Sequence, residues 1–279
     1  MSGFLIGDIG STKGCWSWLS GQDVQIFYTS GYNPVSQHSD VLEQMLREVE
    51  RALPGPVSKG WYYGAGIIDE KTGLVVGSQM QEALQIEMQC FSDLLGAARG
   101  ISSGEQSVVC ILGTGSSSLL FDGRAVVDQI PGLGYPLGDE GSGSDIGRAC
   151  VRGFYYRLMP PELMAAFASE LPADRVEFLA ALAADPAPGR TLAALVPVLL
   201  PFAESAFVSA LLQDSFRTFA RLRIRPYGTD YPVHSVGGIA DTFKKIWHAV
   251  LAEEGLIPGK VMKDPMPGLI AFHQKNFYE

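Results

Sequence analysis

Cysteine is scarce in this chain, and no two cysteines form a C-x-x-C pair. The four that occur are widely scattered: Cys15, Cys90, Cys110 and Cys150. Structural zinc sites and disulfide frameworks use closely spaced cysteines, so neither is expected here. A reduced, cytoplasmic setting is the simplest expectation. The four histidines are also isolated and lack the H-x-x-x-H spacing of a metal site.

Positive charge and long apolar runs are also in short supply. The chain has 21 Lys and Arg against 30 Asp and Glu, a net charge of −9, which argues against a general affinity for nucleic acid or anionic membrane. The apolar run at residues 192–202 is too short and too interrupted by proline to span a bilayer. Residues 1–6 contain no basic stretch, so no signal peptide is expected.

The composition is that of a globular protein with ample material for a core. Of the 279 residues, 47% are hydrophobic and 18% are charged. This length suits one large domain or two smaller domains that share a cleft.

The first part of the chain alternates strand and helix patterns. Apolar alternation predicts the strands, and apolar residues at helical spacing predict the helices. The expected elements are strands at residues 4–9, 14–19, 24–29 and 60–66, and helices at 40–53 (with Ser39 as N-cap), 80–88 and 93–99.

At residue 107 the strand–turn–strand pattern begins again. Strands are expected at residues 108–112 and 116–121, separated by a glycine turn, which favours an internal duplication. Later residues are mostly helical in pattern. A last strand at 232–236, a helix at 241–253 and a final helix at 265–275 are expected.

Residues 7–13 (GDIGSTK) have the pattern of a phosphate-binding turn after a strand. The carboxylate of Asp8 could hold Mg²⁺ through water, since Mg²⁺ prefers oxygen ligands. Gly7 and Gly10 would let the backbone approach a ligand closely. The residues expected at the phosphates are Gly10, Ser11, Thr12 and Lys13. An ordinary hairpin turn with glycine is the alternative, because short glycine patterns have many false positives.

A second turn, Gly113-Thr114-Gly115-Ser116, follows the strand at residues 108–112. Thr114 and Ser116 provide hydroxyls beside bare backbone. Two such turns, one in each half of the chain, suit a ligand bound between two domains. Neither turn matches G-x-x-x-x-G-K-[ST] or G-x-G-x-x-G, so the P-loop and Rossmann classes are disfavoured.

A third segment, residues 132–143 (GLGYPLGDEGSG), leads into a helical pattern and contains two adjacent carboxylates, Asp139 and Glu140. A loop this rich in glycine is hard to explain by packing alone. It completes the set of segments from which a known family can be recognised.

The order GDIGSTK, SDLLGAAR, ILGTGSSS, GYPLGDEGSGSDIGR and SVGGIA resembles the N-acetylglucosamine kinase and BadF/BadG/BcrA/BcrD ATPase family. That family belongs to the acetate-and-sugar-kinase, Hsc70 and actin superfamily. The resemblance extends from Gly7 to about His273. It implies an α/β, two-domain actin-like (ribonuclease H-like) fold with an interdomain cleft, ATP and Mg²⁺. We expect domains at 1–102 and 103–264, with the C-terminal helix (about 265–279) packing back on the first.

The resemblance implies a role for Asp93 as the catalytic base. Its carboxylate would take the proton from the sugar hydroxyl that attacks the γ-phosphate. The alternative is that Asp93 only caps the helix at 93–99.

Other roles follow from the same resemblance. Thr114 and Gly115 match the second phosphate turn, and Gly237 and Gly238 match the adenosine-binding turn. The residues expected at the sugar are Asn33, Ser116, Ser117, Gly132, Gly134, Tyr135 and Asp139. Glu140 could bind sugar, order the loop or cap the helix.

Two departures from the family pattern leave the sugar open. Lys13-Gly14-Cys15-Trp16 stands where Lys-Thr-Asp-Trp is expected, and Ser117 stands where relatives often have Asn. We therefore expect an ATP-dependent kinase of an amino sugar such as N-acetylglucosamine, N-acetylmuramic acid or glucosamine, assembled as a homodimer.

Two alternatives remain at this point. One is an ATPase activator of a radical dehydratase, whose [4Fe–4S] cluster lies between two subunits; Cys110, three residues before the second turn, and Cys150 would then be ligands. The other is a sugar sensor without catalysis, against which the joint presence of Asp8, Asp93 and Asp139 argues.

Overall fold

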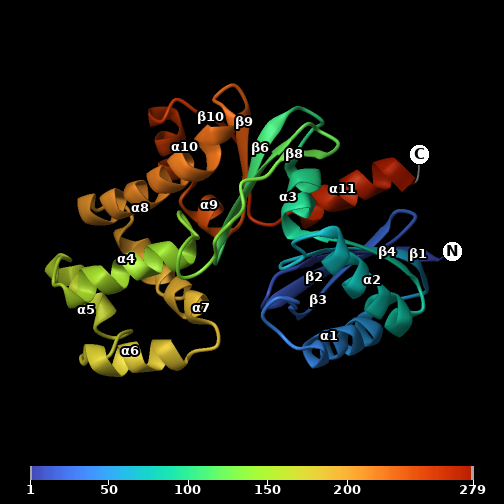
Figure 1. Ribbon diagram of the computed structural model, residues 1–279, viewed down its shortest axis with the longest axis horizontal. Helices are drawn as coiled ribbons and strands as arrows, with labels where there is room; N and C mark the ends of the chain where they lie inside the picture. Colours follow the sequence, from blue (N-terminus) through green and yellow to red (C-terminus); the bar gives the residue numbers. More distant parts are fainter. Residues whose placement is uncertain (1, 278–279) are drawn as a thin grey trace. The chain divides into compact units, whose positions relative to one another are not determined.

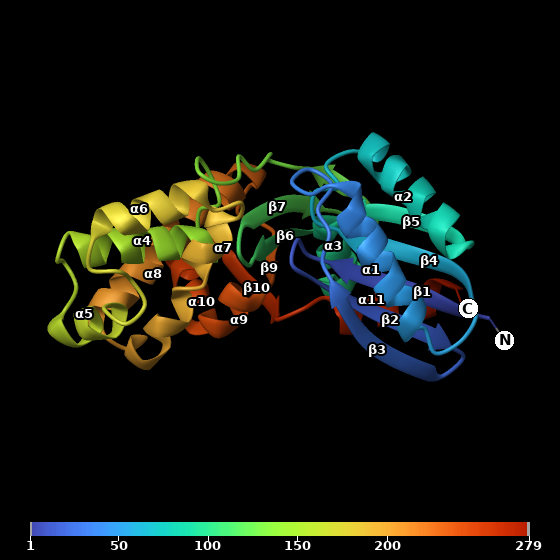
Figure 2. The ribbon, with the colours of Figure 1, turned by 90° about the horizontal axis from the view of Figure 1, so that it is seen from below.

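A computed structural model of the chain describes residues 2–277 (Figures 1 and 2). The chain divides into two compact units. The first runs up to Ser103 and also includes the residues from Asp264 onward; the second is Gly104–Lys263. The α/β, two-domain fold expected from the sequence is confirmed, and the expected interdomain cleft stays a prediction.

The first unit contains a five-stranded sheet of order β3-β2-β1-β4-β5. Strand β1 pairs antiparallel with β2 and parallel with β4. The strands are β1 (Gly3–Ile9), β2 (Lys13–Ser20), β3 (Asp23–Ser30), β4 (Val57–Gly64) and β5 (Glu87–Ser92). The helices are α1 (Ser39–Ala52), α2 (Glu70–Leu84), α3 (Asp93–Ile101) and α11 (Met266–Phe277).

The helices cover both faces of this sheet (Figure 1). On the side of α1 and α2, the core contains Trp16, Tyr62 and Met80. On the side of α3 and α11, it contains Trp61 and Leu269. Apolar side chains of β1 and β4 point to both faces of the sheet and pack against helices there. These strands are therefore buried on both sides, as central parallel strands usually are.

The second unit repeats the same topology. Its sheet has the order β10-β9-β6-β7-β8, with β6 antiparallel to β7 and parallel to β9. This is the arrangement of the first sheet with β6 in the place of β1. The internal duplication favoured by the sequence is therefore supported at the level of topology.

The second unit also contains a larger set of helices. Its strands are β6 (Ser107–Leu112), β7 (Ser116–Phe121), β8 (Val126–Asp128), β9 (Pro232–Val236) and β10 (Ile257–Met262). Its helical elements are α4 (Gly143–Tyr155), α5 (Pro161–Phe167), α6 (Arg175–Ala184), α7 (Pro188–Ala193), η1 (Val196–Phe202), α8 (Ala206–Phe219), η2 (Ala220–Ile224), η3 (Arg225–Tyr227), α9 (Gly238–Thr242) and α10 (Lys244–Glu253). Helix α4 lies alongside α7 and α8 (Figure 2).

Several local expectations are wrong. Residues 80–88 are not one helix, because α2 ends at Leu84 and Met88 lies in β5. Gln85, with φ 54°, takes the left-handed conformation that ends many helices, and the i, i+4 spacing of Met80, Leu84 and Met88 hides this break.

Three more local features differ from expectation. Ser39 is the first residue of α1, and the capping position is His38, which makes no side-chain cap bond. The strand at 232–236 is followed by one more, β10, whose edge position tolerates Pro258. The helix expected at 241–253 is two helices, α9 and α10.

Among the described residues, we find no helix that is long and apolar enough to cross a membrane.

Candidate active site

The first turn, residues 10–13, connects β1 to β2 and is held by backbone contacts. The Gly10 amide donates to the Lys13 carbonyl (3.0 Å), and the Tyr32 amide donates to the Gly10 carbonyl (3.1 Å). Gly31 packs directly against this turn: a Cβ there would lie 2.1 Å from the Gly10 oxygen and 2.5 Å from the Thr12 nitrogen. The turn can therefore take this path only because residue 31 has no side chain.

The two glycines expected to let a ligand approach, Gly7 in β1 and Gly10 in the first turn, have different roles. A Cβ on Gly7 would lie 2.6 Å from the ring of Trp16, so glycine at this position makes room for the indole. This packing explains Gly7 without the expected role in ligand approach. At Gly10, which is exposed, a Cβ would meet only the Lys13 oxygen at 3.5 Å. The backbone of the turn is therefore accessible to a ligand at Gly10.

Asn33, a predicted sugar contact, lies beside the first turn. Its Nδ2 donates to Ser11 Oγ (3.0 Å), and its Oδ1 accepts from the Val35 amide (3.0 Å). Gln37 Nε2 donates to the Ser11 carbonyl (3.3 Å). The loop after β3 and the first turn are therefore one hydrogen-bonded structure.

Lys13, the expected point charge for phosphate, is engaged elsewhere. Its Nζ lies 3.8 Å from the centroid of the Tyr28 ring on strand β3, a cation–π contact. Its role at phosphate stays a prediction.

Asp8 and Asp93 form an acidic site in the first unit. Burial, together with the negative charges of Asp93 and Asp264, raises the pKa of Asp8 to about 7. Burial also raises the pKa of Asp93, opposed by the Leu94 amide. Carboxylates that repel one another in this way favour a bound cation.

Asp93 is not the N-cap of α3. Ser92 holds that position, and its Oγ accepts from the Leu95 amide (3.2 Å). Asp93 is the first helical residue, and its Oδ1 accepts from the Leu94 amide (2.8 Å). Capping therefore does not account for Asp93, and its second carboxylate oxygen, Oδ2, is not used in that contact.

In the second unit, two other glycine-rich segments converge on the second turn. The amides of Gly143 and Ser144, at the start of α4, donate to the carbonyls of Gly113 (2.8 Å) and Thr114 (3.0 Å). Gly237, with φ 125°, packs so closely that a Cβ would lie 2.3 Å from the Leu112 oxygen. The sequence predicted these segments separately, and the fold brings them together.

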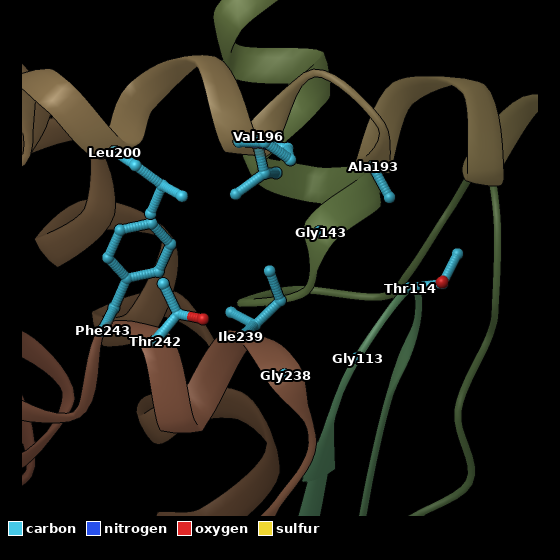
Figure 3. Close-up of a pocket in the computed structure, with 11 residues that line it drawn as sticks. Gly113, Thr114, Gly143, Ala193, Val196, Leu200, Gly238, Ile239, Thr242 and Phe243 are labelled. Atoms are coloured by element: carbon cyan, nitrogen blue, oxygen red, sulfur yellow. The ribbon is translucent and has the colours of Figure 1, made fainter. Parts of the chain in front are cut away.

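A pocket of about 390 Å³ opens where these segments meet (Figure 3). Thr114 borders it on one side, and the side chains of Val196, Leu200, Ile239 and Phe243 border it on the other. The complete lining is Gly113, Thr114, Gly143, Ala193, Val196, Pro197, Leu200, Gly238, Ile239, Thr242 and Phe243.

The apolar wall of this pocket was not predicted from the sequence. It comes from α7, η1 and α9, whose apolar residues have the same pattern as core residues. The proline-interrupted run at 192–202 was the available signal. A mostly apolar pocket beside bare backbone amides suits a flat heteroaromatic group that bears an anionic chain.

Asp139 lies against the second turn. Its Oδ1 accepts from the Ser116 amide (3.1 Å), and a Cβ on Gly115 would lie only 2.8 Å from this oxygen. Asp139 has φ 63°, a left-handed conformation that is uncommon outside glycine and recurs at functional sites. Burial raises the pKa of Asp139, opposed by the hydrogen bond from Ser116.

The other predicted sugar residues of this unit are spread around the same turn. Gly132 and Tyr135 are exposed in the loop before Asp139, and Gly134 is half-buried. Ser117 is half-buried in β7 opposite Ile111, and the buried Oγ of Ser116 has no hydrogen-bond partner in the described structure.

Cys110 and Cys150 are core residues. Both are 0% exposed, and burial raises the pKa of each thiol to about 12. The Cys110 sulfur lies 3.1 Å from Ser235 Oγ inside the sheet. Thiols in this state are inert, because the thiolate is the metal ligand.

The described residues contain no group of three or more His, Cys, Asp or Glu side chains that could hold a metal ion. Asp8 still fits the expected magnesium chemistry, because a cation bound through water needs only one carboxylate and would relieve the repulsion noted above.

Comparison with known proteins gives no match to a protein-family model and none to a curated protein. Solved structures do match. A candidate N-acetylglucosamine kinase from Porphyromonas gingivalis is 33% identical, with a TM-score of 0.92, over 98% of this chain and 99% of that one.

Two more distant structures share the fold alone. A ROK family glucokinase from Streptomyces griseus, in complex with glucose and AMPPNP, is 14% identical with a TM-score of 0.64, over 97% of this chain and 98% of its own. The activator of 2-hydroxyisocaproyl-CoA dehydratase from Clostridium difficile, with bound ADPNP, is 16% identical with a TM-score of 0.51, over 98% and 96%.

Proposed function

The chain belongs to the N-acetylglucosamine kinase family of actin-like sugar kinases, and from this premise we propose that it transfers the γ-phosphoryl group of ATP to an amino sugar. Candidate sugars are N-acetylglucosamine, N-acetylmuramic acid and glucosamine. For the N-acetylhexosamines, the 6-hydroxyl is the proposed acceptor.

The observation that carries the proposal is the setting of Asp93. Its carboxylate lies half-buried at the start of α3, near Asp8, and Ser92 already caps the helix. A base for a sugar hydroxyl needs a raised pKa and a free acceptor oxygen, and burial provides the first. General base catalysis of this kind contributes about 10²–10⁴ in rate.

The second unit supports the nucleotide part of the proposal. Its pocket combines an apolar wall with the second turn and Gly238. The adenine ring would lie against Val196, Ile239 and Phe243, while the amides of Thr114 and Gly115 would face phosphate oxygens. The glucokinase and the activator with the same fold bind AMPPNP and ADPNP.

The remaining site residues would bind and orient. The first turn, residues 10–13, would hold phosphate oxygens through backbone amides, and Asp8 would hold Mg²⁺ through water. When bound, Mg²⁺ neutralises the charge of the transferring phosphoryl group. Asn33, Ser116 and Asp139 would hydrogen-bond the sugar, and Asp93 would accept the proton from its hydroxyl.

An ADP-release assay across a panel of amino sugars tests the proposal. We expect one or more sugars to raise ADP release well above the rate without sugar, with a phosphorylated sugar as the product. ADP release that no sugar increases would contradict the kinase proposal. Saturable sugar binding without turnover would indicate the sensor.

The activator is the alternative that shares this fold. It requires cysteines that reach a cluster between two subunits, whereas Cys110 and Cys150 are both fully buried. Their burial favours the kinase.

A further inference from the structure

Arg223 is a buried arginine in the second unit whose role the proposed function has not used. It lies 5% exposed in η2, a π-helix that follows α8. Burying a guanidinium is costly unless it is paired and hydrogen-bonded. Short π-helical segments often occur at functional sites. The partners of Arg223 therefore indicate why the protein buries this side chain.

The guanidinium of Arg223 lies against the loop at residues 130–140 near its start and at its end. Its Nη2 donates to the Ile130 carbonyl (3.0 Å). A Cβ on Gly132 would lie 3.5 Å from the same nitrogen, so the loop passes close to the guanidinium at this residue. Its Nη1 lies 3.9 Å from Oε2 of Glu140.

The start of the loop has a second anchor from η3, which directly follows η2. The Tyr227 hydroxyl accepts from the Ile130 amide (2.7 Å) and donates to the Ser118 carbonyl (3.0 Å). The Ser118 hydroxyl in turn donates to the Arg223 carbonyl (2.7 Å). Both backbone polar groups of Ile130 are thus held by residues 223–227.

The end of the loop is held more loosely. At 3.9 Å the Arg223–Glu140 pair is electrostatic without a hydrogen bond, and both Arg223 Nε and Glu140 Oε2 are buried without a hydrogen-bond partner. Charge attraction is strong in such a buried place. Arg223 is therefore the link between the two ends of the loop, and Glu140 adjoins Asp139.

We propose that Arg223 is a positioning residue for sugar binding. By attracting Glu140 and bonding Ile130, it holds the loop closed at its base, so that Asp139 stays on the Ser116 amide. Arg223 acts through these residues and does not contact the sugar. The inference rests on the proposed function, and it assigns to Glu140 the role of ordering the loop.

Kinetics of Arg223→Met test the specific effect. We expect the KM for the sugar to rise about tenfold or more, with the KM for ATP within about twofold, because the loop and the nucleotide pocket use different residues. Arg223→Lys, which keeps the charge but loses the forked donors, should lie between wild type and Arg223→Met. Glu140→Gln, which keeps the shape and removes the charge, should raise the same KM.

The matched control is Arg221→Met in the same π-helix. Arg221 is exposed and bonds Glu254 (Nε to Oε2, 2.9 Å), away from the loop. This control should leave both KM values unchanged. Equal rises in both KM values for Arg223→Met would instead indicate a general structural role and overturn the proposal.

Hydrogen exchange tests the same proposal without any activity. In Arg223→Met, the amides of residues 130–140 should exchange at least about tenfold faster than in wild type, while strands β6 and β9 keep their protection. Unchanged loop exchange would overturn the positioning role, even if wild type proves to be a kinase. Faster loop exchange in a protein that phosphorylates no sugar would overturn the proposed function and leave the structural link standing. If Arg223→Met does not fold, Arg223→Lys and Glu140→Gln decide by the same two measurements.

Discussion

At the scale of single residues, the contact between Gly115 and Asp139 joins the second turn to the 130–140 loop. The Asp139 carboxylate accepts the Ser116 amide where a larger residue 115 would not fit. Asp139 also takes a left-handed conformation, so an uncommon backbone conformation lies next to a position where a side chain would not fit. Such conformations persist where the surrounding structure enforces them.

Gly115→Ala should therefore damage sugar phosphorylation more than stability. The new Cβ would lie 2.8 Å from Asp139 Oδ1 and must displace that carboxylate. We expect kcat/KM for the sugar to fall by at least about tenfold, with a stability loss of about 1–2 kcal/mol. Steady-state kinetics and urea unfolding measure the two effects.

A control for this substitution is Gly153→Ala in α4. Its Cβ would meet the flexible end of Met159 at 3.1 Å, and it lies in a helix, where alanine is favoured. It should keep wild-type kinetics. If Gly115→Ala behaves like this control, Asp139 is not held as we describe.

At the scale of elements, β1 and β2 are joined by a turn whose path depends on Gly31. In Gly31→Ala the added Cβ would collide with backbone atoms of Gly10 and Thr12, which cannot move like a flexible side chain. We expect a Tm several degrees lower and a KM for ATP raised about tenfold or more.

Gly10→Ala provides the contrast inside the same turn. Its Cβ meets only the Lys13 oxygen, at an ordinary distance of 3.5 Å, so the Tm should stay close to that of wild type. Equal Tm values for the Gly31 and Gly10 variants would contradict the packing argument.

Helices α3 and α11 meet through a buried histidine that should make stability depend on pH. His273 Nε2 lies 3.0 Å from the Tyr63 hydroxyl, to which Arg99 Nη1 donates (2.9 Å). Burial, together with the charge of Arg99, lowers the pKa of His273 to about 3. The native histidine is therefore neutral at pH 5, and the unfolded one, with an ordinary pKa of about 6.5, is mostly protonated.

Because the unfolded state binds the proton first, this group costs stability as the pH falls from about 6.5 to about 3, by about 1.4 kcal/mol per pH unit. Between pH 7 and pH 5, wild type should lose roughly 2 kcal/mol more than His273→Gln in urea unfolding. Equal losses in the two proteins would show that His273 titrates normally.

Elements were predictable from the sequence where turn residues separate clear periods. Strands β1, β2, β6 and β7 were found because glycine turns separate them. The break after α2 was missed because Gln85, unlike glycine, does not mark a left-handed residue in the sequence. Strand β10 was missed because Pro258 and Gly259 argue against a strand unless it lies at an edge.

The site, like the elements, was predictable from the sequence only in part. The glycine turns and acidic residues have distinctive patterns, whereas Val196, Leu200 and Phe243 have only the pattern of core residues until the fold brings them to the second turn. Arg223 gave no signal either, because an arginine at the end of a helix is ordinary in sequence and unusual only when buried.

At the scale of the whole molecule, one topology occurs twice with different uses. The β1–β2 turn and the β6–β7 turn occupy equivalent places in the two sheets. In our account the first unit provides the base and the second provides the nucleotide pocket. The copies differ most in one connection: α4 to α8 and the 130–140 loop lie between β8 and β9, whereas α1 is the one helix between the equivalent strands β3 and β4 of the described first unit.

The metal content of the whole protein separates the kinase from the activator. Protein purified without oxygen should be colourless and lack stoichiometric iron, because Cys110 and Cys150 are fully buried with pKa values raised to about 12. Iron analysis and the visible absorption spectrum, in which an iron–sulfur cluster gives charge-transfer bands, measure the cluster content. A brown protein with about four irons per dimer would favour the activator.

The central claim is that Asp93 is the base of a sugar kinase, and sugar-dependent ADP release by Asp93→Asn tests it most directly. We predict a rate about 10²–10⁴ below wild type, with ATP and sugar still bound in thermal-shift titrations. Asp69→Asn, at the N-cap of α2, should remain fully active, because Asn also caps helices. Full activity of Asp93→Asn would contradict the account.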